Sequence, residues 1–369
     1  MRNSFWRLVA AAASIAVSGC VASDHFQERV SSYDRAAEKS RDEMILTNII
    51  RASRSEPLSF VSVSGIHGST TATGSVGLPA ITIGPLQTAA EHQFIFGGGS
   101  GSGSPNAVSA TGSTTIDVSV QETKDFYRGL LTPVSPSTVA FFTSQGIPRE
   151  ILFYLFTDRL IETKAGKRRE LRNDPRSPTF EEFKRYVELA MEYGLSSEVI
   201  PAPAGKNAKN GHEEYSRLCF DPLYKSSNVS FVGNNPICGS RARFGQGHNV
   251  STFLSKKGEP VSVEIRPRST FEIFHYLGGL IKAGDNGLVQ LSNQDDASLG
   301  GAKDNILFLV TQGAGPSCFL SVAYADSSYC VPDGSAPNTT RILGLLAQLL
   351  ALNTTITDLP ATPSVRIVP

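Results

Sequence analysis

Apolar residues recur at helical spacing near the start of the chain. Between residues 24 and 54 they recur at intervals of three, four or seven positions, with one adjacent pair, at Phe26, Val30, Tyr33, Ala37, Met44, Ile45 and Ile49, as in an amphipathic helix. The pattern stops before Pro57, since a proline disfavours helix in the residue that precedes it. We predict one long helix, which either packs on the core or lies on a membrane surface.

A period of two replaces the helical period between residues 58 and 122. The alternating apolar positions, typical of strands with one apolar face, are Val61, Val63, Ile81, Ile83, Ile116, Val118 and Val120. A Gly/Ser-rich tract at residues 97–105 separates the last three from the rest and suits a turn or a disordered tip. Residues 60–120 contain two acids, Glu91 and Asp117, and no Lys or Arg.

Three structures fit this segment. The first is a disordered Gly/Ser/Thr-rich loop, because so little apolar surface does not offset the entropy of ordering the chain. The second is an extended hairpin that lies on the rest of the protein. The third is a hairpin that pairs with copies from neighbouring subunits in a closed ring, which would leave no strand edge unpaired.

From residue 123 onward the patterns predict helices and short strands that mostly do not alternate. We expect helices over residues 123–131, 135–145, 147–161, 179–193 and 269–284, and a last one capped by Asn338. Two of them start with the capping-box pattern, Thr179 with Glu182 and Ser269 with Glu272. We expect strands at 198–200, 216–220, 261–266, 306–311, 319–324 and 365–368, with 306–311 and 319–324 forming a hairpin.

These elements predict an α+β fold, in which helices pack on a small, mostly antiparallel sheet. The segment at 58–122 is then a β-hairpin or disordered insert, and residues 123–369 form the globular domain. Residues 20–57 hold the amphipathic helix, and residues 1–19 form a separate leader.

The leader has the layout of a secretory signal: Arg2 and Arg7 precede an apolar run that ends at Val17. The adjoining Val17-Ser18-Gly19-Cys20 resembles the lipobox of bacterial lipoproteins. The resemblance implies that Cys20 becomes the first mature residue and carries acyl chains that anchor the protein in membrane lipid. Because Val21 rather than Asp comes next, it also implies the outer membrane, at its periplasmic face. The C-terminal half resembles uncharacterised proteobacterial lipoproteins in general texture.

The remaining cysteines predict disulfides. Cys219, Cys238, Cys318 and Cys330 form two pairs close in sequence, and an even count in an oxidising compartment favours the bridges 219–238 and 318–330. A zinc site that includes His212 and His248 is the alternative, but neither CxxC nor HExxH spacing occurs. We predict no metal site and no cofactor.

Charge limits the class of partner. Removal of the leader leaves 32 basic against 34 acidic residues, so no basic excess suits nucleic acid. One basic run, Lys164, Lys167, Arg168, Arg169 and Arg172, is either a solvated loop or a contact for phosphate and lipid headgroups.

No catalytic motif stands out: the nucleophile elbow, the P-loop and the dinucleotide fingerprint are absent from the sequence. We therefore expect a protein that acts by binding rather than an enzyme. The first hypothesis is a lipid-anchored envelope protein, a structural or accessory subunit of an outer-membrane assembly, whose partners are other envelope proteins or further copies of itself. The alternative is a periplasm-facing hydrolase or carbohydrate-binding protein with a loop-built site.

Overall fold

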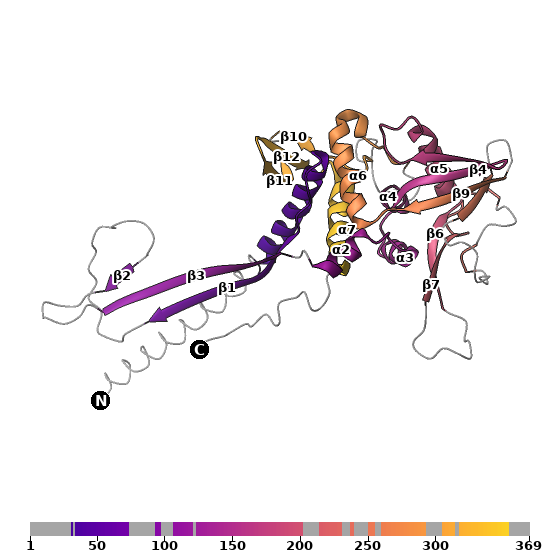
Figure 1. Ribbon diagram of the computed structural model, residues 1–369. Helices are drawn as coiled ribbons and strands as arrows, with labels where there is room; N and C mark the ends of the chain where they lie inside the picture. Colours follow the sequence, from indigo (N-terminus) through magenta and orange to yellow (C-terminus); the bar gives the residue numbers. More distant parts are fainter. Residues whose placement is uncertain are drawn as a thin grey trace, which may run out of the picture. The chain divides into compact units, whose positions relative to one another are not determined.

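The computed structural model (Figure 1) describes residues 31, 34–73, 93–96, 106–120, 123–201, 214–230, 237–239, 250–254, 260–292, 305–313 and 317–353. The chain divides into two compact units. We call residues 39–60 together with 121–358 the body. The described part of the other unit consists mainly of strands within residues 61–120.

The body combines helices with antiparallel sheets, which confirms the predicted α+β class. A helix over residues 34–53, unlabelled in Figure 1 and here called the N-terminal helix, contributes residues 39–53. The labelled helices are α2 (Lys124–Leu131), α3 (Pro136–Ser144), α4 (Arg149–Phe156), α5 (Phe180–Glu192), α6 (Thr270–Ala283), the short 3-10 helix η1 (Gly284–Gly287) and α7 (Pro337–Asn353).

The strands of the body form three separate sheets. The largest has the order β5 (Lys167–Arg172), β4 (Thr157–Lys164), β9 (Pro260–Pro267) and β8 (Val250–Leu254). A two-stranded sheet pairs β6 (Leu195–Pro201) with β7 (Glu214–Phe220). The third has the order β10 (Thr311–Gln312), β12 (Ser327–Pro332) and β11 (Cys318–Tyr324).

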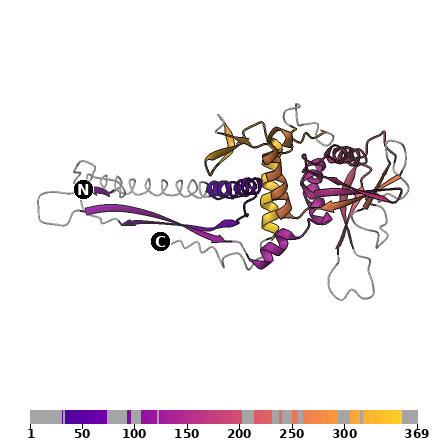
Figure 2. The same ribbon diagram turned by 45° about the horizontal axis from the view of Figure 1, so that its top comes forward.

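Residues 39–53 of the N-terminal helix pack on the core, which is one of the two placements that the apolar pattern allowed. Its residues Ile45, Leu46, Ile49 and Ile50 are completely buried. It packs against α6, which lies beside α7 in both ribbon views (Figures 1 and 2). Aromatic rings pack together in the core at the end of residues 39–60. Phe60 makes edge-to-face contacts with Phe126 at 5.3 Å and with Phe274 at 5.5 Å between ring centroids, a favoured geometry.

Side-chain caps mark the starts of α2, α3 and α6, but not those of two other predicted helices. At α6, Ser269 accepts from Glu272 N and the Glu272 carboxylate accepts from Ser269 N, which confirms the capping box. The box predicted at Thr179 is wrong, because the Thr179 hydroxyl accepts from Arg172 N instead. Asn338 is no cap either; it lies inside α7, is fully buried and donates to Ile306 O.

The helix predicted over residues 147–161 is half wrong. It ends at Phe156, and Thr157 begins strand β4. All eight residues of α4 are buried, so apolar residues surround the helix and the sequence carries no amphipathic period that would mark its end. The neighbouring strand β5 lies where the run of basic residues indicated a solvated loop.

The predicted hairpin of residues 306–311 with 319–324 is also wrong. Strand β12 lies between β10 and β11 and pairs antiparallel with both. Of residues 306–311, only Thr311 belongs to a strand. The predicted strand at 365–368 lies outside the described residues.

The second unit contains a long antiparallel hairpin of β1 (Val61–Thr73) and β3 (Asn106–Val120), which we call the long hairpin. Its twelve paired positions span about 40 Å at ~3.4 Å per residue. The short β2 (Gln93–Phe96) pairs with residues 106–109 of β3. Within its described strands the insert is therefore ordered rather than a disordered loop.

Candidate functional site

The outer edges of the long hairpin are the first candidate site. Strand β1 stands at one edge of its sheet, since the strand order is β1, β3, β2. Strand β2 covers only residues 106–109 of β3, so residues 110–120 form the opposite edge as far as the described strands extend. An edge strand presents a row of N–H and C=O groups, ready to pair with another strand.

These edges lack the usual protection against pairing. Edge strands of monomeric proteins commonly carry charges, prolines or bulges, and β5 at the edge of the largest sheet follows this rule with five charged residues out of six. By contrast, β1 and β3 contain no Lys, Arg or Pro, and Asp117 is their one acid. One register shift, between Val63 and Gly65, interrupts the pairing. The long hairpin is thus suited to bind a further strand.

Both predicted disulfides are present. Cys219 bonds to Cys238 at 2.00 Å and Cys318 to Cys330 at 2.02 Å between sulfur atoms. The first joins β7 to residues 237–239, where Glu198 of β6 accepts hydrogen bonds from the Arg217 side chain and from Gly239 N. The second links β11 to β12 inside their own ladder. Such bridges fit an extracytoplasmic compartment.

The first disulfide bears on the alternative zinc site. Glu198 lies within 4.8 Å of the sulfurs of Cys219 and Cys238, which makes these three the potential metal-ligand group of the described residues. Zinc binds thiolates, whereas both sulfurs are here joined to each other. His212 and His248 lie outside the described residues.

The basic residues that were candidates for headgroup contact do not form one surface. They lie on the β4–β5 hairpin, where Lys164 is in register with Lys167 next to the turn. Successive side chains of a strand face opposite sides. Arg168 contacts Glu264 of β9 at 3.4 Å, Arg169 contacts Glu162 of β4 and Glu182 of α5, and Arg172 lines a cleft of the body.

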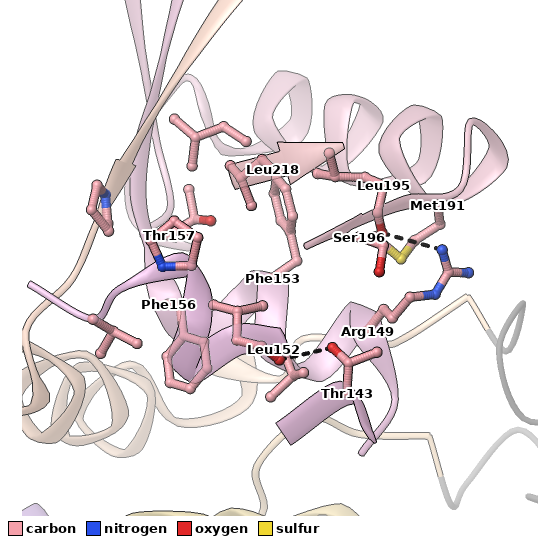
Figure 3. Close-up of a pocket in the computed structure, with 15 residues that line it drawn as sticks. Thr143, Arg149, Leu152, Phe153, Phe156, Thr157, Met191, Leu195, Ser196 and Leu218 are labelled. Carbon is pink, nitrogen blue, oxygen red and sulfur yellow. Dashed lines mark hydrogen bonds between the residues drawn. The ribbon is translucent and has the colours of Figure 1, made fainter. Parts of the chain in front are cut away.

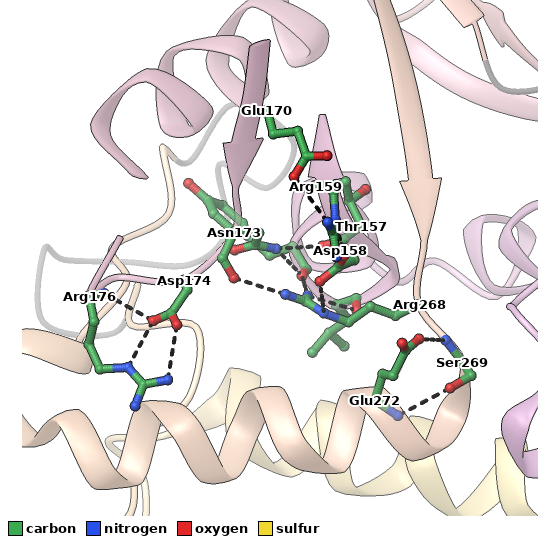
Figure 4. A network of polar contacts seen from close by, with 12 residues as sticks. Thr157, Asp158, Arg159, Glu170, Asn173, Asp174, Arg176, Arg268, Ser269 and Glu272 are labelled. Atoms are coloured by element: carbon green, nitrogen blue, oxygen red, sulfur yellow. Dashed lines mark hydrogen bonds and ion pairs between the residues drawn. The ribbon is translucent and has the colours of Figure 1, made fainter. Parts of the chain in front are cut away.

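This cleft, which we call the arginine cleft, lies between the end of the β4–β5 hairpin and α6 and has a volume of about 240 Å³ (Figure 4). Four guanidinium groups line it, from Arg159, Arg172, Arg176 and Arg268. They come from β4, β5, the loop after β5 and the residue before the α6 cap. The fold brings these distant segments together because Arg159 lies opposite both Arg172 and Arg266 in the sheet register.

Arg268 has a structural role in the floor of the cleft. It is 4% exposed and donates to Tyr154 O, Leu155 O and Asn173 O at 2.8, 3.3 and 2.9 Å (Figure 4). Two of these carbonyls lie in the last turn of α4, where orphan C=O groups and the helix dipole favour a cation. Its guanidinium carbon lies 3.8 Å from the centroid of the Tyr276 ring, a cation–π contact. Burial lowers the pKa of Arg268, and the nearby anionic groups oppose this shift.

The acids of the cleft are already engaged. Asp158 accepts from Arg159 at 2.6 Å, Asp174 accepts from Arg176 at 3.0 and 2.9 Å, and Glu272 accepts from Ser269 N at 2.8 Å (Figure 4). Burial tends to raise the pKa of Asp174, but its hydrogen bonds from Arg176 bring the net pKa below the usual value. An ionised carboxylate held by arginine is a poor general acid, so this geometry favours binding over acid–base chemistry.

An apolar cavity of about 60 Å³ lies elsewhere in the body, between α3, α4 and the β6–β7 hairpin (Figure 3). Its walls include Phe153, Phe156, Met191 and Leu218. Arg149 stands at one end, donates to Leu195 O at 3.2 Å and stacks on Tyr224 at 4.2 Å. Because this guanidinium is bound to the protein and the other walls are mainly apolar, the cavity brings together no reactive groups.

Sequence reasoning found Arg172 but missed the rest of the arginine cleft. Arg268 directly precedes the Ser269 capping box, and Arg176 and Asp174 flank Pro175. Neither spacing is a known motif, and the cleft exists only because β4, β5 and α6 pack together. A local signal for it is therefore absent.

No protein family model, curated protein or solved structure matches this chain. Within the part of the chain that the structure describes, no helix has the length and apolar character needed to cross a membrane. A function is thus inferred from the geometry of the two candidate sites.

Proposed function

We propose that this chain is a lipid-anchored cell-envelope protein that acts by binding, as a structural or accessory subunit of an outer-membrane assembly. The observation that carries the proposal is the long hairpin, whose two outer edges carry no Lys, Arg or Pro over 11 to 13 residues each. The lipobox at Cys20 supports the anchor, and the two disulfides support the oxidising side of a membrane.

The proposed partner strand comes from a second copy of the same chain. One hairpin offers two edges of similar length on opposite sides, so β1 of one copy and β3 of the next satisfy each other's backbone groups. This association is head-to-tail, and it forms a ring when the rotation between copies closes. Each added copy buries one open edge and supplies another, and closure removes the last.

Adding positive charge to the edge strand β1 tests whether copies pair through it. In Thr70→Lys/Thr71→Lys, one lysine faces each side of β1, which mimics the protection that natural edge strands carry. Thr340→Lys, on the exposed side of α7, is the control for the same chemical change. After crosslinking in intact membranes, the parent and the control should give multimers, and the double variant should give monomers.

The anchor requires its own test. Mass spectrometry of the N-terminal peptide should show acyl groups on Cys20, and Cys20→Ser should leave the membrane fraction. A membrane-bound Cys20→Ser protein with an unmodified parent would refute the anchor without affecting the crosslinking result. A parent protein that never crosslinks, to itself or to another protein, would refute the assembly role.

The second candidate function is the hydrolase or carbohydrate-binding protein, which requires a pocket with convergent polar groups. The arginine cleft favours the binding part of this alternative. Its acids, however, are held by arginines or by a helix cap, so we propose ligand binding there without catalysis.

A further inference from the structure

We propose that the arginine cleft binds a phosphoryl group, as carried by inorganic phosphate, a sugar phosphate or a phospholipid headgroup. This inference is independent of the long hairpin and of the lipid anchor. It rests on three features of the cleft: an arginine, Arg172, without an ion pair among the described residues, buried polar atoms without hydrogen bonds, and adequate volume.

The first feature is an excess of one positive charge, because four arginines line the cleft together with three acids, Asp158, Asp174 and Glu272. Asp158 pairs with Arg159, and Asp174 with Arg176. Arg172 makes no ion pair with any described residue, whereas Arg268, which also lines the cleft, pairs with Asp158 at 4.0 Å. Arg172 is exposed, and its planar guanidinium fork matches the oxygens of a phosphoryl group.

The second feature is a pair of buried polar atoms without hydrogen bonds. Among the described residues, Asn173 Oδ1 and the Tyr276 hydroxyl find no hydrogen-bond partner that meets the distance and angle limits; both residues line the cleft and are 2% and 8% exposed. Contact with the Asn173 side chain tends to lower the Tyr276 pKa. Burial nevertheless raises the Tyr276 pKa overall, so its hydroxyl keeps its proton and is able to donate.

A phosphoryl ligand suits this combination of groups. Its oxygens accept from guanidinium and from a tyrosine hydroxyl, and a protonated phosphate oxygen or a sugar hydroxyl donates to an amide oxygen. Unpaired buried polar groups are rare in native proteins. A purely apolar ligand would leave both atoms unsatisfied.

The third feature is room. The cleft volume of about 240 Å³ is many times the ~10–15 Å³ that one water molecule needs. Gly279 and Leu280 of α6 form part of the wall. A phosphoryl group therefore fits together with part of the molecule that carries it.

Calorimetric titration of the full chain in mild detergent tests the site with inorganic phosphate and, separately, with glucose 1-phosphate at constant ionic strength. Arg172→Ala should weaken binding about tenfold or more, since a hydrogen bond to a charged group is lost. Arg168→Ala is the matched control: it lies on the same strand, does not line the cleft, and should leave the affinity unchanged.

Vesicle flotation separates the sources of the phosphoryl group. The Cys20→Ser protein is used here, so that the anchor does not mask headgroup binding. If a lipid is the ligand, this protein should float with phosphatidic acid vesicles and not with phosphatidylcholine vesicles, and Arg172→Ala should abolish flotation. The inference is overturned if neither phosphate compound binds and flotation fails. Equal losses in Arg172→Ala and Arg168→Ala would also overturn it, since they would reveal general charge attraction.

Discussion

Two adjacent glycines of α6 provide a stringent test of how the N-terminal helix is held. Gly278 lies against the end of that helix: an added Cβ would stand 2.6 Å from Ser53 N and 2.8 Å from both Ala52 C and Ala52 Cβ. At Gly279 the nearest atom is Arg176 Nη2 at 3.6 Å, an ordinary contact. The same substitution to alanine therefore meets a backbone at one position and makes only an ordinary van der Waals contact at the other.

The expected effects have opposite signs. Alanine is favoured over glycine inside a helix by about 1 kcal/mol, so Gly279→Ala should raise the free energy of unfolding by up to that amount. At Gly278 the same gain is set against overpacking, which typically costs about 1–3 kcal/mol. Two of the three close atoms at that site are backbone, which yields less readily than a flexible side chain. Gly278→Ala should thus be less stable than Gly279→Ala by about 1–3 kcal/mol.

Urea unfolding followed by far-ultraviolet circular dichroism measures this difference, with the disulfides kept intact. The urea concentrations at the unfolding midpoints are compared only if the two variants share the same dependence of the free energy of unfolding on urea concentration. A change in the unfolded state is then not mistaken for a change in stability. Equal stability of the two variants would refute the close packing of the N-terminal helix on α6.

Three further predictions address other parts of the body. Cys219→Ser/Cys238→Ser should lower the free energy of unfolding by about 3 kcal/mol, from the 19-residue separation of the bridge, and thermal unfolding with and without reductant checks this. Asn48→Ala should cost about 2–4 kcal/mol in urea unfolding, because both Asn48 amide atoms hold the Ser59 backbone at 2.8 Å and the variant leaves two polar groups unpaired. The pKa of Asp174 is lower in the folded protein than its ordinary value of 3.8. Ionised Asp174 therefore contributes to the free energy of unfolding above pH 3.8, and this contribution is lost as the pH falls through the folded pKa. Asp174→Asn should accordingly lose less stability on acidification than the parent, and pH-dependent unfolding curves that are parallel would contradict this.

Local signals in the sequence predicted the structure where short-range physics decides it. The Ser269 capping box, the two disulfides between nearby cysteines and the buried face of the N-terminal helix are all set within a few residues or by one clear period. Thr179 shows the limit of such signals, because an equally good box fails when the hydroxyl finds a tertiary donor, Arg172 N.

Contacts between residues far apart in the sequence determine the features that the sequence did not predict. The end of α4 at Phe156 is invisible in an apolar run that is buried on all sides, and the place of β12 between β10 and β11 depends on hydrogen bonds that no periodicity encodes. The arginine cleft is the extreme case, since Arg268 bonds to Tyr154 O across 114 positions of the chain. Its guanidiniums look like scattered surface charges until the sheet and α6 bring them together.

Amide hydrogen exchange along β1, on acylated protein in native membranes or mild detergent, distinguishes assembled copies from an isolated hairpin. In an isolated antiparallel hairpin, alternate amides of each strand point to the partner and the others point outward. If copies pair edge to edge, we expect slow exchange at consecutive residues of β1, and a return to alternation in Thr70→Lys/Thr71→Lys. Alternate fast and slow amides along β1 in the membrane-bound parent protein would contradict edge-to-edge assembly.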